Sequence, residues 1–222
     1  MFGHRSTLPL LKRVYQFIKR TQERMLDRKR QEDAEKRIAF FEPPYMLHVG
    51  CGHNRFDGWL NIDLNDNLDT VDISWDASKR FPFDDGSCTL IYSEHFLEHL
   101  TVEQASTFLS ECYRLLRPGG TLRIATPSLS EIIQKYNSGD WRNQDWLTKS
   151  EYQFIETGAE MVNIAFRWWG HKWLYDREEL RRRLHDAGFG EVTDVGWGKS
   201  NVPDLRNRET RKDSLLICEA WK

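Results

Sequence analysis

Three side chains that can move a proton stand close together in this sequence: His95, Glu98 and His99. Their spacing of i, i+3 and i+4 places them near one face of the segment if it is helical. An imidazole is an effective general base near neutral pH, and a neighbouring carboxylate can hold it in the right orientation. We therefore predict that His95 or His99 deprotonates an attacking group, such as a hydroxyl, and that Glu98 orients the base.

Two alternatives remain open for this segment. In a purely structural role, Glu98 caps nearby backbone amides and His99 makes a buried hydrogen bond. In a metal-dependent role, the three residues join His171 to hold a divalent cation. The sequence alone supports no assignment of metal ligands. His171 is kept as a fourth candidate catalytic residue.

A glycine-rich turn provides a second kind of site. The apolar run 47–49 ends in Gly50-Cys51-Gly52, and a second apolar run ends in Asp63, which Leu64 follows. Glycines let the backbone approach a ligand that a Cβ atom would keep away. A carboxylate at the end of the neighbouring strand can accept from both hydroxyls of a ribose. This pattern predicts a nucleoside site.

The spacing narrows the choice of nucleoside. A dinucleotide site needs a third glycine and an acid about twenty residues downstream. Here the third glycine is missing and Asp63 follows Gly52 by eleven residues, which leaves no room for an ordinary crossover helix. A cofactor without phosphates is therefore expected: S-adenosylmethionine (SAM), with S-adenosylhomocysteine as its product.

Two further strand ends complete the expected cofactor site. The apolar run 71–75 ends in Asp76-Ala77, where a carboxylate can accept from the adenine amino group. A fourth strand, 89–92, leads into Ser93 and Glu94. The predicted cofactor-binding residues are Gly50, Cys51, Gly52, Asp63, Leu64, Asp76, Ala77, Ser93 and Glu94.

The remaining pattern alternates between helices and strands. Thr101 and Gln104 are placed as a capping box, and an apolar stripe follows them to Leu116. Arg117-Pro118-Gly119-Gly120 should end this helix, with a strand from 121 to 125. A helix over 176–187 and strands near 192–195 and 215–220 close the chain.

Five motifs in this order resemble the class I SAM-dependent methyltransferases, within them a small bacterial type-11-like group often found beside polysaccharide and glycan genes. The motifs are Val49-Gly50-Cys51-Gly52, Gly58 to Asp63, Phe81-Pro82-Phe83, Leu97-Glu98-His99-Leu100 and Leu116 to Gly120. The resemblance implies an α/β, Rossmann-like three-layer sandwich. Its seven-stranded, mostly parallel sheet ends in an antiparallel C-terminal hairpin. His48 or Val49 stands where the family commonly carries an acid.

The first 42 residues are expected to form a separate appendage. Apolar residues recur at helical spacing over residues 8–38 amid many lysines and arginines, and Pro43-Pro44 ends the segment. We expect a basic amphipathic helix that packs on its own domain or a partner, or that lies on a membrane surface. Interspersed acids and a net charge of −2 argue against nucleic acid as a partner.

Residues 130–176 are rich in tryptophan and tyrosine. An insert after the fifth strand should lie over the strand ends, so we expect it to be a lid over the acceptor. The alternative is that its rings only pack the insert onto the sheet. A later loop carries Arg206, Arg208, Glu209 and Arg211, either as a solvated turn or as an anion contact.

Together these patterns predict a SAM-dependent methyltransferase over residues 43–222 that modifies a hydroxyl of a saccharide or glycan precursor. Alternatives are methylation of a small aromatic or lipid-linked acceptor, and a SAM-binding regulatory or scaffold protein without turnover. The sequence contains no long apolar run, and its four cysteines show no metal-binding or paired spacing. We expect a cytoplasmic protein, either free or at the inner face of the membrane.

Overall fold

A computed structural model describes residues 8–222 of the chain. The chain divides into two compact units, residues 1–41 and 42–222. The first contains α1 (Leu8–Ile38), the long helix that the sequence predicts. Oppositely charged side chains one turn apart support this helix, including an Arg28–Glu32 pair at 3.0 Å. Among the described helices, none has the length and apolar character needed to span a membrane.

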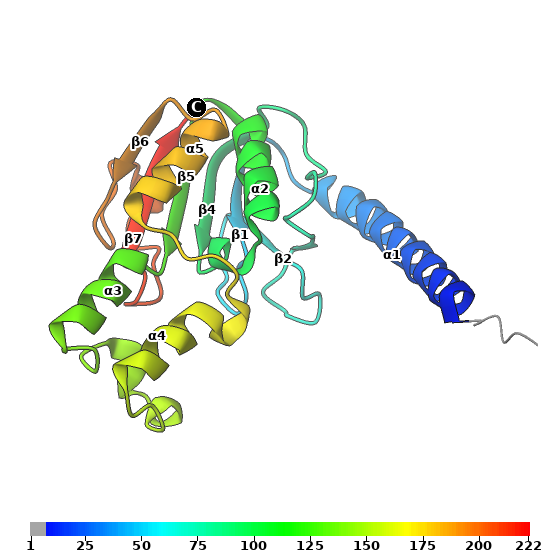
Figure 1. Cartoon of the computed structure of the whole chain (residues 1–222). Helices are drawn as coiled ribbons and strands as arrows, with labels where there is room; N and C mark the ends of the chain where they lie inside the picture. The colour runs from blue at the N-terminus through cyan, green and yellow to red at the C-terminus, as the bar shows by residue number, and fades with distance from the viewer. Residues whose placement is uncertain (1–7) are drawn as a thin grey trace, which may run out of the picture. The chain divides into compact units, whose positions relative to one another are not determined.

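The second unit is built on one seven-stranded sheet in the order β3-β2-β1-β4-β5-β7-β6 (Figure 1). Strands β1 to β5 pair in parallel, and β7 runs antiparallel to both β5 and β6. This arrangement confirms the predicted Rossmann-like fold with its antiparallel C-terminal strands. The strands are β1 (Tyr45–Val49), β2 (Leu60–Asp63), β3 (Ile73–Ser74), β4 (Cys88–Glu94), β5 (Leu116–Thr126), β6 (Glu191–Asp194) and β7 (Leu216–Trp221).

The helices of this unit follow β4 and β5. They are α2 (Val102–Leu115), α3 (Leu129–Ser138), α4 (Gly158–Arg167) and α5 (Arg177–Asp186). The short 3-10 turns are η1 (Leu97–His99), η2 (Asp145–Thr148), η3 (Ser150–Tyr152), η4 (Trp168–Gly170) and η5 (Pro203–Leu205). Helix α2 begins at the predicted capping box of Thr101 and Gln104. Helices α2 and α5 lie side by side on one face of the sheet (Figure 1).

The start of β5 differs from the expected strand. We expected the strand to begin at residue 121, but it begins at Leu116, directly after α2. Leu116 pairs with Cys88 and Thr121 pairs with Leu90, so the intervening residues form a bulge. Gly119 turns there with φ +78° and donates its N–H to the Lys222 carbonyl at 2.7 Å. The proline-glycine motif therefore bends the strand instead of preceding it.

The two faces of the sheet are covered differently. Neighbouring residues of a strand point to opposite faces, so Leu47 and His48 of β1 contact different layers. The ring of His48 stacks on Phe56 with centroids 3.9 Å apart, and Phe56 and Trp59 pack with Tyr92 of β4 in one buried cluster. Side chains from the loop between β1 and β2 thus cover the face that carries His48.

A buried ionic cluster closes the same face near β5 and β7. Arg123 of β5 is fully buried and lies 2.6 Å from Glu219 of β7 and 2.6 Å from Glu209. Its guanidinium also donates to the carbonyl of Lys199 at 2.8 Å. Glu209 and Lys199 belong to the long loop between β6 and β7, which is thereby held to the sheet. The sequence leaves a solvated turn or an anion contact open for the loop that carries Glu209. In the structure Glu209 instead forms a buried ion pair with Arg123.

The insert between β5 and α5 has a small core of its own. Its buried residues are Ile132, Leu147, Ile155, Met161, Ile164, Ala165 and Leu174. Trp141 and Trp146 are partly buried against this core, as the packing alternative had suggested for single tryptophans. Figure 1 shows α3 and α4 beyond the end of the sheet at which β5 leads into α3. The insert is therefore a compact subdomain at that end.

We predict that Arg123→Met lowers the free energy of unfolding by about 3–5 kcal/mol, because two buried carboxylates lose their shared counter-charge. Urea unfolding measures this loss. Arg182→Met is the matched control. It removes exposed ion pairs to Glu179 and Asp186 on α5 and should cost less than about 1 kcal/mol. Equal losses in the two variants would contradict the role given to Arg123.

Candidate functional site

The glycine-rich turn joins β1 to the loop before β2. Gly50 has φ +71°, and a Cβ atom there would lie 2.8 Å from the Phe96 side chain, so only glycine fits without rearrangement. Gly52 has φ +51°, and a Cβ atom there would meet nothing within 4 Å. Open space therefore lies beside this backbone, as a site for a close-lying ligand requires.

Asp63 and Asp76 lie at the ends of neighbouring parallel strands. One carboxylate oxygen of Asp63 accepts from the Gly52 N–H at 2.9 Å, which ties the end of β2 to the glycine turn. Asp76 instead accepts from the backbone and hydroxyl of Ser78, at 3.1 and 2.6 Å, within its own loop. Ala77 is buried beside it, whereas Leu64 is half exposed. The structure brings Asp63 directly to the glycine turn.

Ser93 and Glu94 end β4 in different surroundings. Ser93 pairs with Val49 next to the glycine turn, and its buried hydroxyl has no hydrogen-bond partner in the described chain. The Glu94 carboxylate is buried and accepts from Thr210 N, from the Ser214 hydroxyl at 2.6 Å and from Arg211 N at 3.1 Å. Ser93 is thus available to a ligand, and Glu94 holds the loop between β6 and β7.

Burial controls the protonation of two residues near the turn. Burial lowers the pKa of His48 to about 4, although its hydrogen bond to Asn61 opposes that shift. His48 is therefore neutral at physiological pH, in the position where the family that this sequence resembles commonly carries an acid. Burial raises the pKa of the Cys51 thiol to about 12, so this cysteine stays protonated and is no nucleophile.

The proton-moving residues cluster directly after β4. His95 has φ +48°, a left-handed conformation that is rare outside glycine, and its side chain is buried. Its Nδ1 lies 3.3 Å from Glu98 Oε1 and its Nε2 lies 3.9 Å from Asp213. His95 therefore stands between two carboxylates, one of them from the loop between β6 and β7.

Glu98 is the centre of this cluster and has no exposed surface. Its Oε2 accepts from the Thr126 hydroxyl at 3.0 Å, and its Oε1 faces His95. Burial opposes ionisation, yet the neighbouring His95 holds the pKa of Glu98 below its usual value. A buried, ionised carboxylate needs compensating positive charge or donors nearby, and the His95 imidazole beside it can supply them.

His171 reaches the cluster from the insert. The carbonyl of Glu98 accepts from the backbone N–H groups of Lys172 and Trp173, at 2.8 and 3.2 Å, which fixes this segment against η1. His171 Nε2 lies 3.9 Å from Glu98 Oε1, and the rings of His171 and His99 are 4.9 Å apart. The structure therefore brings together all four predicted catalytic residues.

Aromatic rings continue from this cluster to the surface. Trp169 lies 5.4 Å from the ring of His171 and donates from its indole N–H to the Tyr152 hydroxyl at 3.0 Å. Trp168, Trp169 and Trp173 are 50%, 42% and 42% exposed, too much for a purely packing role. These rings offer apolar faces beside the imidazoles.

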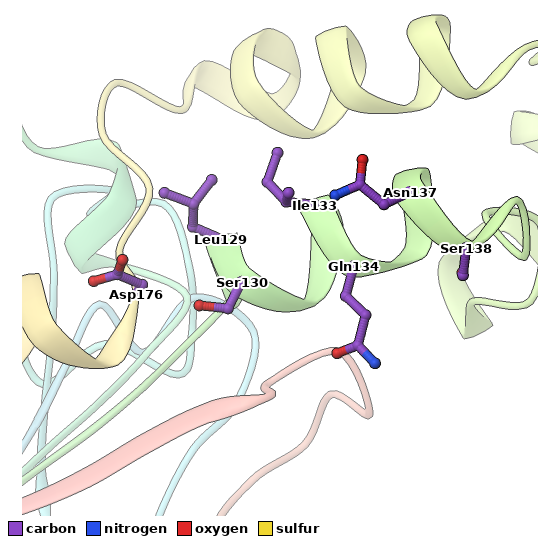
Figure 2. A pocket seen from close by; sticks show the side chains of 7 residues that line it. All are labelled: Leu129, Ser130, Ile133, Gln134, Asn137, Ser138 and Asp176. Atoms are coloured by element: carbon purple, nitrogen blue, oxygen red, sulfur yellow. The ribbon is translucent and has the colours of Figure 1, made fainter.

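A pocket of about 700 Å³ lies along α3 and contains none of the predicted site residues. Figure 2 shows its lining, which runs from Leu129 to Ser138 on α3 and ends at Asp176. The only titratable side chain in this lining, Asp176, already caps α5 by accepting from Glu179 N at 2.8 Å. We therefore place the chemistry at the Glu98 cluster and not in this pocket.

Sequence reasoning missed Thr126 and Asp213 as members of the cluster. Thr126 stands at the carboxyl end of β5, where a polar side chain is a usable signal. Asp213 lies in the long loop after β6, which buried contacts of Glu94 and Arg123 hold to the sheet, and it is thereby brought close to His95. No pattern in the neighbouring sequence identifies Asp213 as a site residue.

Comparison with known proteins agrees with these features. Residues 47–124, which span β1 to β5, match the family described as methyltransferase domain. Phosphoethanolamine N-methyltransferase of Plasmodium falciparum is 28% identical over 152 residues, which are 60% of this chain and 54% of that protein. The chain thus spans about half the length of this curated relative.

Solved structures show the same fold. A SAM-dependent methyltransferase from Archaeoglobus fulgidus aligns with a TM-score of 0.50 at 16% identity, over 86% of this chain and 92% of that one. A possible histamine N-methyltransferase from Thermotoga maritima aligns with a TM-score of 0.50 at 15% identity, over 93% and 96% of the two chains. At these identities the likeness concerns the fold.

The matched methyltransferase domain supports the cofactor prediction, SAM with S-adenosylhomocysteine as its product. The residues present fit this cofactor. Gly52 leaves open space, Asp63 stands beside it, and the buried hydroxyl of Ser93 lacks a partner in the described chain. Glu94, whose carboxylate is occupied by the loop between β6 and β7, fits such a contact less well.

We predict that Asp63→Asn weakens SAM binding by about 10- to 100-fold, because a charged acceptor for the ribose hydroxyls is lost. Calorimetric titration with SAM measures the change. Asp66→Asn, an exposed acid of the following loop, is the matched control and should bind as the wild type does. Unchanged affinity in a folded Asp63→Asn variant would remove Asp63 from the cofactor site.

We also predict that stability falls as the pH is lowered from about 6.5 to about 4. His48 takes up its proton at about pH 4 in the folded chain, whereas the ordinary pKa is 6.5, so acid favours the unfolded state in this window. The contribution is roughly 3 kcal/mol when complete. Urea unfolding across this pH range should show a shallower fall for His48→Gln, whereas the exposed His53→Gln should behave like the wild type.

Proposed function

We propose that this chain is a SAM-dependent methyltransferase that acts on a hydroxyl of a saccharide or glycan precursor. The observation that carries the proposal is the buried Glu98 with His95, His99 and His171 around it, in the segment whose Phe96 packs against Gly50 of the glycine turn. Methyl transfer to a hydroxyl needs this combination, because the acceptor must be aligned and must lose a proton.

The bound cofactor supplies an electrophilic methyl group. The chain supplies the base, for which half-buried His99 is the best-placed candidate, because the side chains of His95 and His171 are buried. Burial and the neighbouring histidines lower the pKa of His99, although the charge of Glu98 opposes the shift. His99 is therefore neutral and able to accept a proton near neutral pH.

The exposed tryptophans support a saccharide as the acceptor. Apolar faces of sugar rings stack on aromatic side chains, and Trp168, Trp169 and Trp173 expose such faces close to His171. The family resemblance to proteins found beside glycan genes supports the same class. A small aromatic or lipid-linked acceptor would use the same rings.

The similarity to a phosphoethanolamine N-methyltransferase favours a second candidate, transfer to the nitrogen of a small amine. Exposed tryptophan rings attract cationic groups as well as sugars, so the same surface could take an amine. A panel that contains sugar hydroxyls and small phosphorylated amines, assayed for S-adenosylhomocysteine release, separates the two. No turnover on any acceptor, with SAM bound, would favour the regulatory or scaffold role.

We predict that Glu98→Gln and His99→Ala lower turnover by about 10²–10⁴-fold and leave SAM affinity within a few-fold, because general-base assistance has this magnitude. Initial rates on the acceptor found in the panel, with calorimetry on the same samples, test this. His185→Gln on α5 is the matched control and should turn over normally.

Normal turnover in both test variants would show that the segment after β4 is structural. The base would then have to come from His171 or from Tyr175, whose buried hydroxyl has no partner in the described chain.

A further inference from the structure

Glu98, His99 and His171 each offer a ligand atom, and these atoms all lie within 4.8 Å of one another. Two of the residues are adjacent on η1, and the third comes from the insert, more than seventy residues later in the sequence. The backbone hydrogen bonds from Lys172 and Trp173 to the Glu98 carbonyl hold the two segments in this register. His95, which the metal-dependent alternative included, is not part of this group.

A hydrogen bond determines which ring nitrogen of His171 carries the proton in the neutral ring. Its Nδ1 lies 2.8 Å from the carbonyl of Ala165, and a carbonyl only accepts, so Nδ1 must carry the proton. In the neutral ring, Nε2 then presents a lone pair, and this atom lies 3.9 Å from Glu98 Oε1. Two acceptors that face each other repel, and either a proton on Nε2 or a metal ion bound between them would relieve this repulsion. Metal-ligating histidines are usually oriented by this kind of hydrogen bond at the other nitrogen.

Glu98 is likewise oriented by a hydrogen bond to one of its two carboxylate oxygens. Its Oε2 is oriented by the Thr126 hydroxyl at 3.0 Å, and its Oε1 is buried with no hydrogen-bond partner in the described chain. Among the described residues, its ion-pair partners within 4 Å are the histidines His95 and His171, and no lysine or arginine is present there. A cation-accepting oxygen is thus held in place beside two imidazoles.

We propose that Glu98, His99 and His171 bind one divalent transition-metal ion of the zinc type. Two imidazole nitrogens with one carboxylate oxygen suit Zn²⁺ and similar ions, whereas Mg²⁺ prefers oxygen ligands and retains water. Three protein ligands leave a coordination position for an outside oxygen, as catalytic zinc sites do. Metal binding does not depend on the proposed function. With a metal bound, His99 would be a ligand and not the base, and the metal would instead favour loss of the acceptor proton, a role that rests on the proposed function.

The experiment uses the full chain, freed of metal with a chelator and titrated with Co²⁺ and with Zn²⁺. We expect one ion per chain, with visible Co²⁺ absorption in the wild type. His171→Ala should weaken binding by more than about 100-fold, since even changes outside the ligand shell cost 10- to 100-fold. His185→Gln is the matched control, because His185 also has Nδ1 2.8 Å from a carbonyl but belongs to no ligand group in the described chain.

Thr126→Val tests the same site if Glu98→Gln fails to fold, and should weaken binding by about 10- to 100-fold without changing the ligands. Circular dichroism confirms the fold of each variant. Absence of a saturable ion, or unchanged binding in folded His171→Ala, would overturn the proposal. Metal binding without turnover on any acceptor would leave the metal site intact and remove the proposed function, and full turnover by metal-free protein would remove the metal from the reaction.

Discussion

Two buried carboxylates at the carboxyl end of β4 organise this molecule, because each must find donors that water cannot supply. Glu94 takes hydrogen bonds from Thr210, Arg211 and Ser214, which brings in the loop between β6 and β7. Glu98, four residues later, accepts from the Thr126 hydroxyl and lies beside His95, and its carbonyl holds the insert. The residues at the end of β4 therefore hold both the loop between β6 and β7 and the insert beside the site. Removing the Glu94 carboxylate would release the loop between β6 and β7, whereas the backbone carbonyl of Glu98 would hold the insert even without the Glu98 carboxylate.

The sheet shows how a reduced set of helices can still enclose a core. The connections between β1 and β4 contain no helix, so aromatic residues and loops take over the covering of one face. Arg208 of the long loop lies over the rings of Phe56 and Trp59, at 4.7 and 5.3 Å, and joins this layer. A polar loop can cover a sheet only where its buried charges are paired, and the Arg123 cluster provides that pairing.

Features with a local cause were predictable from the sequence. The capping box at Thr101, the glycine turn and Asp63 depend on neighbouring residues or on a short spacing, and the structure has them. The bulge at Gly119 was not predictable, because the bond to Lys222 that supports it joins distant residues. Asp213 was missed for the same reason. His95, Glu98 and His99 were predicted as one group from their spacing, but the position of His171 beside Glu98 depends on how the insert docks.

The position of β7 has a consequence for how this chain is made. Strand β7 lies between β5 and β6, although it follows both in the sequence. During synthesis β5 therefore presents an unpaired edge until residues 216–221 have left the ribosome, and such edges recruit strands from other chains. Thr210, Arg211 and Ser214, which donate hydrogen bonds to Glu94, also leave the ribosome late. The newly made chain consequently depends on late, long-range pairing, and chaperone protection at that stage should matter more for its yield than the stability of the finished sheet.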